Sequence, residues 1–332
     1  MTSDDTALTM PKAELHLHIE GALEPELAFE LARRNGVTLP YADVADLRRR
    51  YDFADLQSFL DLYYTGMSVL CTARDFTDLA DSYLTRASRQ GVRHAEIFFD
   101  PQAHTTRGVP MTTIIDGLEA ALSTSEQRFG ISTRLIACFL RDHGPEAAKA
   151  TFDELLPHSH RLTGVGLDSA ELGYPPRDFE TVFARARDAG LRLVAHAGEE
   201  GPPEYIWQTL DVLGVERVDH GVRAVEEDAL LRRLADDRMP LTVCPISNVR
   251  LRCVDTLDVH PLPRLVAAGL STSINSDDPT YFGGYVGDNF HAVQQHLGFD
   301  DAALRQFAAN SFQASFLDQP GRDRLLGELD PT

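Results

Sequence analysis

Short apolar segments recur at a regular spacing along the chain, and this recurrence limits the possible folds more than any other feature. Each segment lacks strict alternation of polar and apolar residues, which is typical of strands buried on both faces of a parallel sheet. Eight such segments are present, at residues 12–20, 94–101, 133–141, 164–171, 191–200, 217–222, 240–248 and 270–279.

Amphipathic segments with helical spacing separate the apolar runs, at residues 25–36, 73–91, 179–190 and 203–214. Several end in glycine, a common residue just after a helix. Eight strands alternating with helices predict an α/β fold, a (β/α)8 TIM barrel. The stretch 37–90 exceeds one crossover, so we expect extra helices after the first strand. The tail from about residue 286 predicts a helical C-terminal extension.

One other architecture, a doubly wound sheet, fits an alternation of strands and helices. That fold would favour a GxGxxG turn after an early strand, and the sequence contains none. Of the 332 residues, 43% are hydrophobic, which is enough for a sizeable core. We therefore expect one barrel domain spanning residues 1–332.

The charge and cysteine content exclude several classes of protein. A formal net charge of −20 argues against nucleic-acid binding, which depends on clustered Lys and Arg. No run approaches ~18 apolar residues, and residues 1–12 lack the features of a signal peptide, so no membrane partner is expected. The four cysteines form no CxxC pair, which favours free thiols in a reducing cytoplasm. No oligomeric state is predicted.

The first apolar run contains the stretch AELHLHIEG, with two histidines two residues apart. In a strand His16 and His18 point to the same face. One histidine on an apolar face is usually a core residue with satisfied hydrogen bonds. When two histidines share such a face, a structural role and a metal-binding role for the pair are about equally plausible.

Other strand ends add more potential ligands, in the sequences HAGE, DHG and NSDDP. In a parallel barrel these ends meet at one mouth, where the active site lies. Several imidazoles with a carboxylate suit zinc with an open position for water. The residues alone therefore suggest a metal-assisted hydrolase.

The motifs HLHIEG, HAGEE, DHG and NSDDP, in this order, resemble those of the adenosine/adenine deaminase family of the amidohydrolase superfamily. The resemblance runs from about residue 10 to 320. Finer features, such as FADLQSFLDLYYTG and NSDDPTYFGGY, are similar to the adenine deaminase branch.

The resemblance implies one Zn²⁺ per chain, held by four side chains: His16, His18, His196 and Asp277. Glu199 would donate a proton to N1 of a purine, His220 would orient the attacking hydroxide and carry its proton, and Asp278 would hydrogen-bond N7. The implied reaction converts adenine to hypoxanthine and ammonia in purine salvage. The implied partner is a small purine substrate.

Two departures from adenosine deaminases bear on the substrate. Glu20 stands where those enzymes usually carry Asp near the ribose, and it would intrude on the space of a sugar. Glu171 aligns with a glycine that meets N3 of the purine. A carboxylate there could accept from N9–H, which exists in free adenine only. The alternative for Glu171 is a plain surface acid at a strand end.

The sequence also allows other substrates and another function, and several further residues have expected locations. Adenosine, an N6-substituted adenine or another 6-aminopurine are alternative substrates, and a catalytically silent binding module is a remote alternative. His94 and His104 are expected to be structural. Six other histidines are expected in solvent: His143, His158, His160, His260, His291 and His296. Three apolar residues are core candidates that the resemblance places in a lid over the purine: Phe59, Leu60 and Tyr63.

Overall fold

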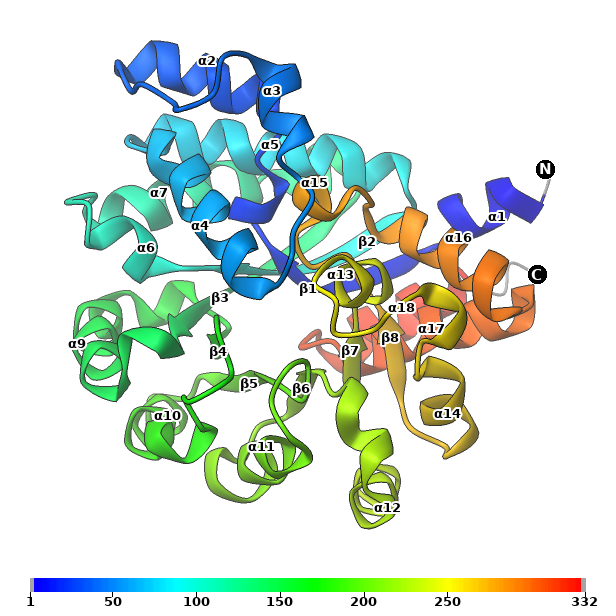
Figure 1. Cartoon of the computed structure of the whole chain (residues 1–332). Coiled ribbons are helices and arrows are strands. Elements are labelled where there is room, and N and C mark those ends of the chain that lie inside the picture. Colours follow the sequence, from blue (N-terminus) through cyan, green and yellow to red (C-terminus); the bar gives the residue numbers. More distant parts are fainter. Residues whose placement is uncertain (1–2, 330–332) are drawn as a thin grey trace.

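The strands form one eight-stranded parallel sheet in sequence order, in a computed structural model that describes residues 3–329 (Figure 1). Each expected apolar run contains a strand, so the predicted (β/α)8 barrel is confirmed. The strands are β1 Lys12–His18, β2 Val92–Phe99, β3 Ser132–Leu140, β4 Gly164–Asp168, β5 Arg192–Ala197, β6 Arg217–His220, β7 Leu241–Val243 and β8 Thr272–Ile274.

The barrel closes between β1 and the segment that follows β8. Leu17 forms a parallel bridge with Asp277. The Asp277 N–H donates to the His16 carbonyl at 3.1 Å, and the His18 N–H donates to the Asp277 carbonyl at 3.1 Å. The closing hydrogen bonds therefore join three residues that were expected to hold a metal.

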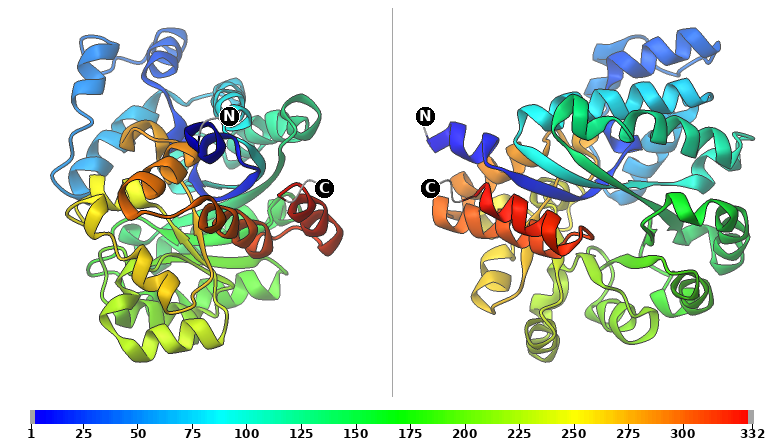
Figure 2. Two further views of the ribbon diagram at one scale, coloured as in Figure 1. Left: turned by 90° about the vertical axis from the view of Figure 1, so that its right-hand side faces the viewer. Right: turned by 180° about the vertical axis from the view of Figure 1, so that it is seen from behind.

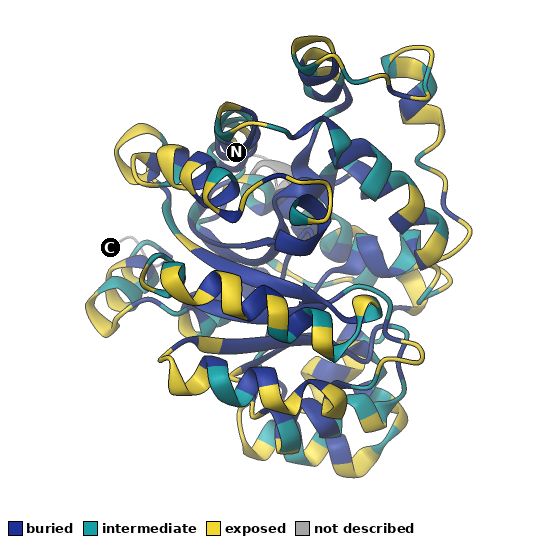
Figure 3. Ribbon diagram, turned by 90° about the vertical axis from the view of Figure 1, so that its left-hand side faces the viewer, coloured by how far each residue is buried: buried dark blue, intermediate teal, exposed yellow. Residues whose placement is uncertain are grey.

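Helices surround the sheet, and their inward faces are buried while their outward faces are exposed (Figure 3). The helices up to β7 are α1 Ser3–Thr9, α2 Pro25–Asn35, α3 Val44–Arg49, α4 Leu56–Gly66, α5 Ala73–Arg89, α6 Pro101–Thr105, α7 Met111–Leu122, α8 Ser125–Phe129, α9 Pro145–Leu155, α10 Glu180–Asp188, α11 Pro203–Gln208 and α12 Asp228–Asp236. Among the described residues, none of the helices has the length and apolar character needed to cross a membrane.

The expected insertions are present at both places. Between β1 and β2 the chain adds α3 and α4 before the long helix α5. After β7 follow α13 Pro245–Arg250, α14 Leu262–Ala267, α15 Pro279–Phe282, α16 Val286–Leu297, α17 Asp301–Ala314 and α18 Gln319–Gly327. Helix α1 packs on α16 and α17, so the two ends of the described chain lie on the same side of the barrel (Figure 2).

Local sequence explains several element ends. Gly91 and Gly190, which follow α5 and α10, have φ values of 75° and 81°, a conformation that favours glycine. The run 240–248 was expected to be a strand throughout, but β7 ends at Val243 and a helix begins at Pro245. Proline has no N–H for the sheet and is well suited to the first turn of a helix.

A buried ion pair lies away from the carboxyl ends of the strands. Arg217, the first residue of β6, donates to Glu96 Oε2 of β2 at 2.6 Å, and both side chains are inaccessible to solvent. His94 lies 3.3 Å from Glu96 and 2.8 Å from the Ser132 hydroxyl. His94 is therefore structural, as expected.

Candidate functional site

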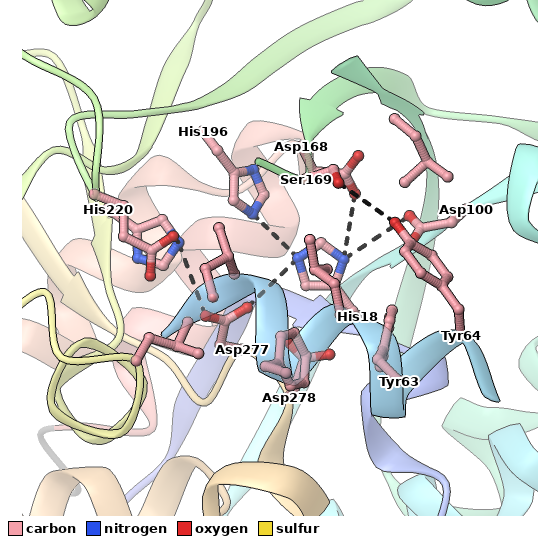
Figure 4. A pocket seen from close by; sticks show the side chains of 16 residues that line it. His18, Tyr63, Tyr64, Asp100, Asp168, Ser169, His196, His220, Asp277 and Asp278 are labelled. Carbon is pink, nitrogen blue, oxygen red and sulfur yellow. Dashed lines mark hydrogen bonds and ion pairs between the residues drawn. The ribbon is translucent and has the colours of Figure 1, made fainter. Parts of the chain in front are cut away.

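Histidines and carboxylates from distant parts of the chain meet at the carboxyl ends of the strands (Figure 4). His16 and His18 end β1, His196 lies near the end of β5, and Asp277 follows β8. All four are buried, with exposures of 6% or less. The four ligands implied by the sequence are thus brought together.

The distances within this cluster fit a tetrahedral metal site. His18 Nε2 lies 3.1 Å from His196 Nε2, and Asp277 Oδ1 lies 3.3 Å from His16 Nε2 and 3.5 Å from His18 Nε2. Zinc bonds of 2.0–2.1 Å in tetrahedral geometry place ligand atoms roughly 3.3 Å apart. Three imidazole nitrogens and a carboxylate this close without a cation would leave buried polar groups poorly satisfied, and His16 Nε2 makes no well-oriented hydrogen bond to any described residue.

The opposite nitrogen of each histidine faces an oxygen atom. His16 Nδ1 lies 3.0 Å from the Thr242 hydroxyl, His18 Nδ1 lies 3.5 Å from Asp168, and His196 Nδ1 lies 3.7 Å from Asp219. The hydrogen bond at His16 is of the kind that holds a metal-binding imidazole in one orientation and leaves Nε2 for the metal. At His18 and His196 the carboxylates face Nδ1 without a hydrogen bond, so their effect there is electrostatic.

Three residues of the site adopt left-handed backbone conformations that are uncommon outside glycine. The φ values of Ser169, His220 and Asp277 are 67°, 63° and 66°. Each residue lies at or just after the end of a strand, where the chain turns away from the barrel. Such conformations carry a cost that the surrounding structure must offset, and they concentrate at functional sites.

Glu199 and His220 lie beside the cluster as a candidate proton-transfer pair. Their side chains approach to 3.5 Å between Glu199 Oε2 and His220 Nε2, and His220 Nε2 lies 3.8 Å from Asp277 Oδ2. Burial, together with the charges of Asp277 and Glu171, raises the pKa of Glu199 well above its usual value. Burial lowers the pKa of His220 to about 3. Glu199 is therefore suited to hold a proton, and His220 to be neutral.

Asp278 lines the same cavity next to the Asp277 carboxylate, and a glycine in the first motif makes room for it. A Cβ atom added to Gly21 would lie 2.6 Å from the Asp278 Cα, a distance that real contacts do not reach. The glycine of HIEG thus allows the first βα loop to pack against Asp278. Burial and the charge of Asp277 raise the pKa of the Asp278 carboxyl well above its usual value.

Helix α4 forms a lid over the cavity. Five of its residues line the cavity: Leu56, Phe59, Leu60, Tyr63 and Tyr64. The helix begins with a capping box in which Asp55 accepts from the Ser58 N–H at 2.8 Å and Ser58 Oγ returns a contact to the Asp55 backbone. The aromatic and apolar residues expected over a planar base are therefore in place.

Two further carboxyls, Asp100 and Asp168, form the wall on the far side of His18 from His220 (Figure 4). His18 Nδ1 lies 3.5 Å from Asp168 and 4.0 Å from Asp100. Tyr64 and Ser169 complete this wall, with their hydroxyls 3.4 Å apart. No role was expected for these two carboxyls, although they lie within the apolar runs 94–101 and 164–171.

Glu20 and Glu171, expected against the substrate, lie one layer behind the cavity, and neither lines it in the described part of the chain. Glu20 Oε1 accepts from His104 Nε2 at 2.8 Å and from the Asp100 N–H at 3.2 Å. Glu171 is 1% exposed and accepts from the Gly201 N–H. The chain turns after β4, which directs Glu171 toward the Glu199 loop, so the expectation of direct contact is corrected for both residues. Glu171 is also no surface acid.

Asn248 and His260 also belong to the surroundings of the site and were missed in the sequence. Asn248 Nδ2 lies 3.2 Å from His220 Nδ1 and 3.4 Å from Glu199 Oε1. His260 was expected in solvent but is 3% exposed, and its Nε2 lies 3.2 Å from Asn248 Oδ1. Ser247 donates to Asp277 Oδ2 at 2.6 Å. One indication was present in the sequence, the polar pair Ser247 and Asn248 at the end of the apolar run 240–248.

Comparisons with known proteins agree with this geometry. A family model described as adenosine deaminase matches residues 11–332. An adenine deaminase from Streptomyces coelicolor is 62% identical over 328 residues, which cover 98% of this chain and 96% of that protein. An adenine deaminase from Hahella chejuensis is 53% identical over 321 residues, which cover 97% of this chain and 96% of that protein.

Solved structures give the same result. The crystal structure of an adenine deaminase from Arthrobacter aurescens has a TM-score of 0.95 and 55% identity, covering 97% of this chain and 98% of that one. An amidohydrolase from Burkholderia ambifaria, with bound zinc, has a TM-score of 0.87 and 30% identity, covering 98% and 93%. With the family model matching nearly its whole length, the chain belongs to the adenosine deaminase family.

Proposed function

We propose that this chain hydrolyses adenine to hypoxanthine and ammonia, using one Zn²⁺ per chain. The observation that carries the proposal is its 53–62% identity, over nearly the whole length, to proteins that are named adenine deaminases. The cavity supports it, since six residues of the site line one space beneath an aromatic lid: His18, His196, Asp277, Glu199, His220 and Asp278. We further propose that the cytoplasm is where the enzyme works, as its free cysteines suggest.

Seven side chains of the site have a role in this reaction. His16, His18, His196 and Asp277 would hold zinc, which in such a site supplies a hydroxide nucleophile at neutral pH because it lowers the pKa of a water molecule.

Glu199 would donate a proton to N1 of adenine, and C6 becomes electrophilic as a result. The burial that raises its pKa supports this role, because the side chain must be protonated when the base binds. His220, with its proton on Nε2, would donate a hydrogen bond that orients the attacking oxygen toward C6. It would then pass this proton to N6 and take the proton of the new C6 hydroxyl in exchange. Asp278 would hydrogen-bond N7 and keep the ring in register. The C6–O bond forms, the C6–N6 bond then breaks, and ammonia leaves with the proton that His220 supplies to N6. The proton from Glu199 stays on N1 of hypoxanthine.

Initial rates with zinc-loaded protein test the proposal. Adenine, adenosine and an N6-substituted adenine would be compared by the absorbance change that accompanies loss of the 6-amino group. We expect adenine to be preferred by orders of magnitude in kcat/KM. Glu199→Gln, prepared in the same way, controls for a contaminating deaminase. A preference for adenosine, or no activity on any of the three despite bound zinc, would rule the proposal out.

A further inference from the structure

The cavity is lined by three buried carboxyl oxygens that no described residue satisfies, the Oδ1 atoms of Asp100, Asp168 and Asp278. Asp100 ends the β2 run and lines the cavity at 2% exposure, and its Oδ1 has no hydrogen-bond partner in residues 3–329. A buried carboxyl oxygen without a donor is costly, and native structures rarely leave one in that state. An N–H group of the molecule that fills the cavity is the donor this atom lacks.

The carboxyls around the cavity follow one another in a fixed order. Glu199 lies beside His220 at one end, the metal-binding cluster lies in the middle, and Asp100 lies at the other end, beyond His18 (Figure 4). Asp278 lies beside Asp277, between His220 and Asp100 in the view of Figure 4. Across the cavity, the order of these groups is therefore Glu199, the metal site, Asp278 and Asp100.

The edge of adenine presents its atoms in a matching order. With C6 at the metal site, N1 faces Glu199 and N7 faces Asp278. N9 follows N7 around the five-membered ring, in the direction of Asp100. Adenine has two kinds of N–H group: the amino group on C6, which is the leaving group, and N9–H. Only N9–H remains to satisfy an acceptor at the far end.

We infer that Asp100 accepts a hydrogen bond from N9–H of the purine and restricts the site to 6-aminopurines without a substituent on N9. The inference rests on the proposed function, since it assumes that a 6-aminopurine is deaminated in this cavity. A sugar or alkyl group on N9 would remove the donor and press against a buried carboxyl. Sites that hydrogen-bond a substrate group reject analogues lacking it far more strongly than apolar pockets do.

The surroundings of Asp100 hold it in place for this role. The Asp100 backbone N–H donates to Glu20 Oε1 at 3.2 Å, and the same oxygen accepts from His104 Nε2 at 2.8 Å. Arg107 in turn donates to His104 Nδ1 at 2.8 Å. Glu20, which has no direct access to the cavity, thus acts on the substrate as a positioning residue for Asp100.

Glu171 is the competing acceptor for N9–H, and its contacts argue against it. One carboxyl oxygen of Glu171 accepts from the Gly201 N–H, and the other lies 3.9 Å from the Arg141 guanidinium. The second oxygen has no hydrogen-bond partner in residues 3–329, but Glu171 does not line the cavity, whereas Asp100 does. Asp168 also lines the cavity and lies closer than Asp100 to His18 Nδ1, at 3.5 Å against 4.0 Å.

The test compares adenine with 9-methyladenine, which lacks N9–H. In wild type we expect kcat/KM for adenine to exceed that for 9-methyladenine by at least about 100-fold, as expected when a polar site loses its partner. Asp100→Ala should lower kcat/KM for adenine about 10- to 100-fold and leave or improve that for 9-methyladenine. The ratio between the two substrates should then fall at least tenfold.

Controls keep the outcomes separate. Asp142→Ala removes a nearby acid that does not line the cavity and should preserve the ratio. Asp100→Leu, which is similar in size to aspartate and has no acceptor, replaces Asp100→Ala if the latter does not fold, and should lower adenine turnover selectively. An unchanged ratio in both Asp100 variants, or a ratio lost in Glu171→Gln alone, overturns the inference. Failure of wild type to deaminate adenine would instead overturn the proposed function.

Discussion

Asn248 Nδ2 lies 3.2 Å from His220 Nδ1, and the direction of this hydrogen bond is fixed from outside the cavity. The Leu262 N–H donates to His260 Nδ1 at 3.1 Å, so the proton of neutral His260 is on Nε2, 3.2 Å from Asn248 Oδ1. The Asn248 amide must then present its N–H to His220. His220 Nδ1 is thereby an acceptor, and its proton is on Nε2, which faces Glu199.

Changing Asn248 to Asp should reverse this arrangement. A carboxylate can only accept, so it would favour a proton on His220 Nδ1 and leave Nε2 without one. A catalytic histidine held in the wrong tautomer can lose several orders of magnitude in kcat, so we expect a loss of at least about 100-fold. Steady-state kinetics give the loss, and zinc content should stay near that of wild type.

Two variants separate the tautomer from simple loss of packing. Asn248→Ala imposes neither tautomer and should retain more activity than Asn248→Asp. His260→Gln offers an amide N–H in place of the imidazole N–H, and should retain more activity than His260→Leu. Equal losses in Asn248→Asp and Asn248→Ala would contradict the role of the hydrogen-bond direction.

Replacing Glu199 by Gln should remove the proton donor while keeping its shape. General acid catalysis contributes typically ~10²- to 10⁴-fold, so kcat should fall by that amount with little change in zinc content. Burial raises the pKa of Glu199, and an acid is active below its pKa. The wild-type rate should therefore decline as pH rises through that pKa, and the residual rate of Glu199→Gln should lack this decline. A variant within tenfold of wild type would exclude Glu199 as the donor.

Removing the metal should lower both activity and thermal stability. A ligand that binds only the folded state at 1,000 times its Kd stabilises by about 4 kcal/mol, so chelation should lower the melting temperature by several degrees and zinc should restore it. His196→Ala should abolish this response. The matched control is His296→Ala, on the exposed surface of α16, where the side chain is 50% exposed. Equal zinc content in the two variants would contradict the assigned ligand set.

Much of the fold was predictable from the sequence because its signals are local. Buried parallel strands produce apolar runs, and the helices between them repeat at helical spacing, so each expected run contains a strand. Strand ends were less predictable. The run 240–248 continues in apolar residues beyond β7, and only Pro245 marks the change to a helix.

Within the site, the predictable residues were those carried by distinctive motifs, such as His16 and His18. Asp100 and Asn248 could not be identified, because an acid or amide after an apolar run is most often solvated. The role of Asp100 depends on Glu20, which is 80 positions away in the sequence, and the role of Asn248 depends on His220, which is 28 positions away. His260 follows the same logic: the local sequence DVHPLP indicates a surface loop, and only tertiary packing buries it against Asn248.

The buried ion pair of Glu96 and Arg217 should make stability sensitive to acid. Burial by itself would raise the pKa of Glu96, but the Arg217 charge and hydrogen bonds from His94 and the Phe316 N–H outweigh it and lower the pKa from 4.5 to about 2. Because the folded-state pKa is the lower one, the stabilisation is present above pH 4.5 and is lost as pH falls through 2. The shift corresponds to about 3 kcal/mol.

Glu96→Gln should remove this pH dependence and also destabilise the fold at neutral pH, since it leaves the Arg217 charge unpaired. Breaking a buried pair from one side costs about 3–5 kcal/mol, which urea unfolding at pH 7 would measure. Between pH 4.5 and 2 the variant should lose about 3 kcal/mol less than wild type. Glu126→Gln, which removes an exposed partner of Arg324, should behave like wild type. Parallel stability curves for wild type and Glu96→Gln across this range would show that Glu96 already carries a proton in the folded protein.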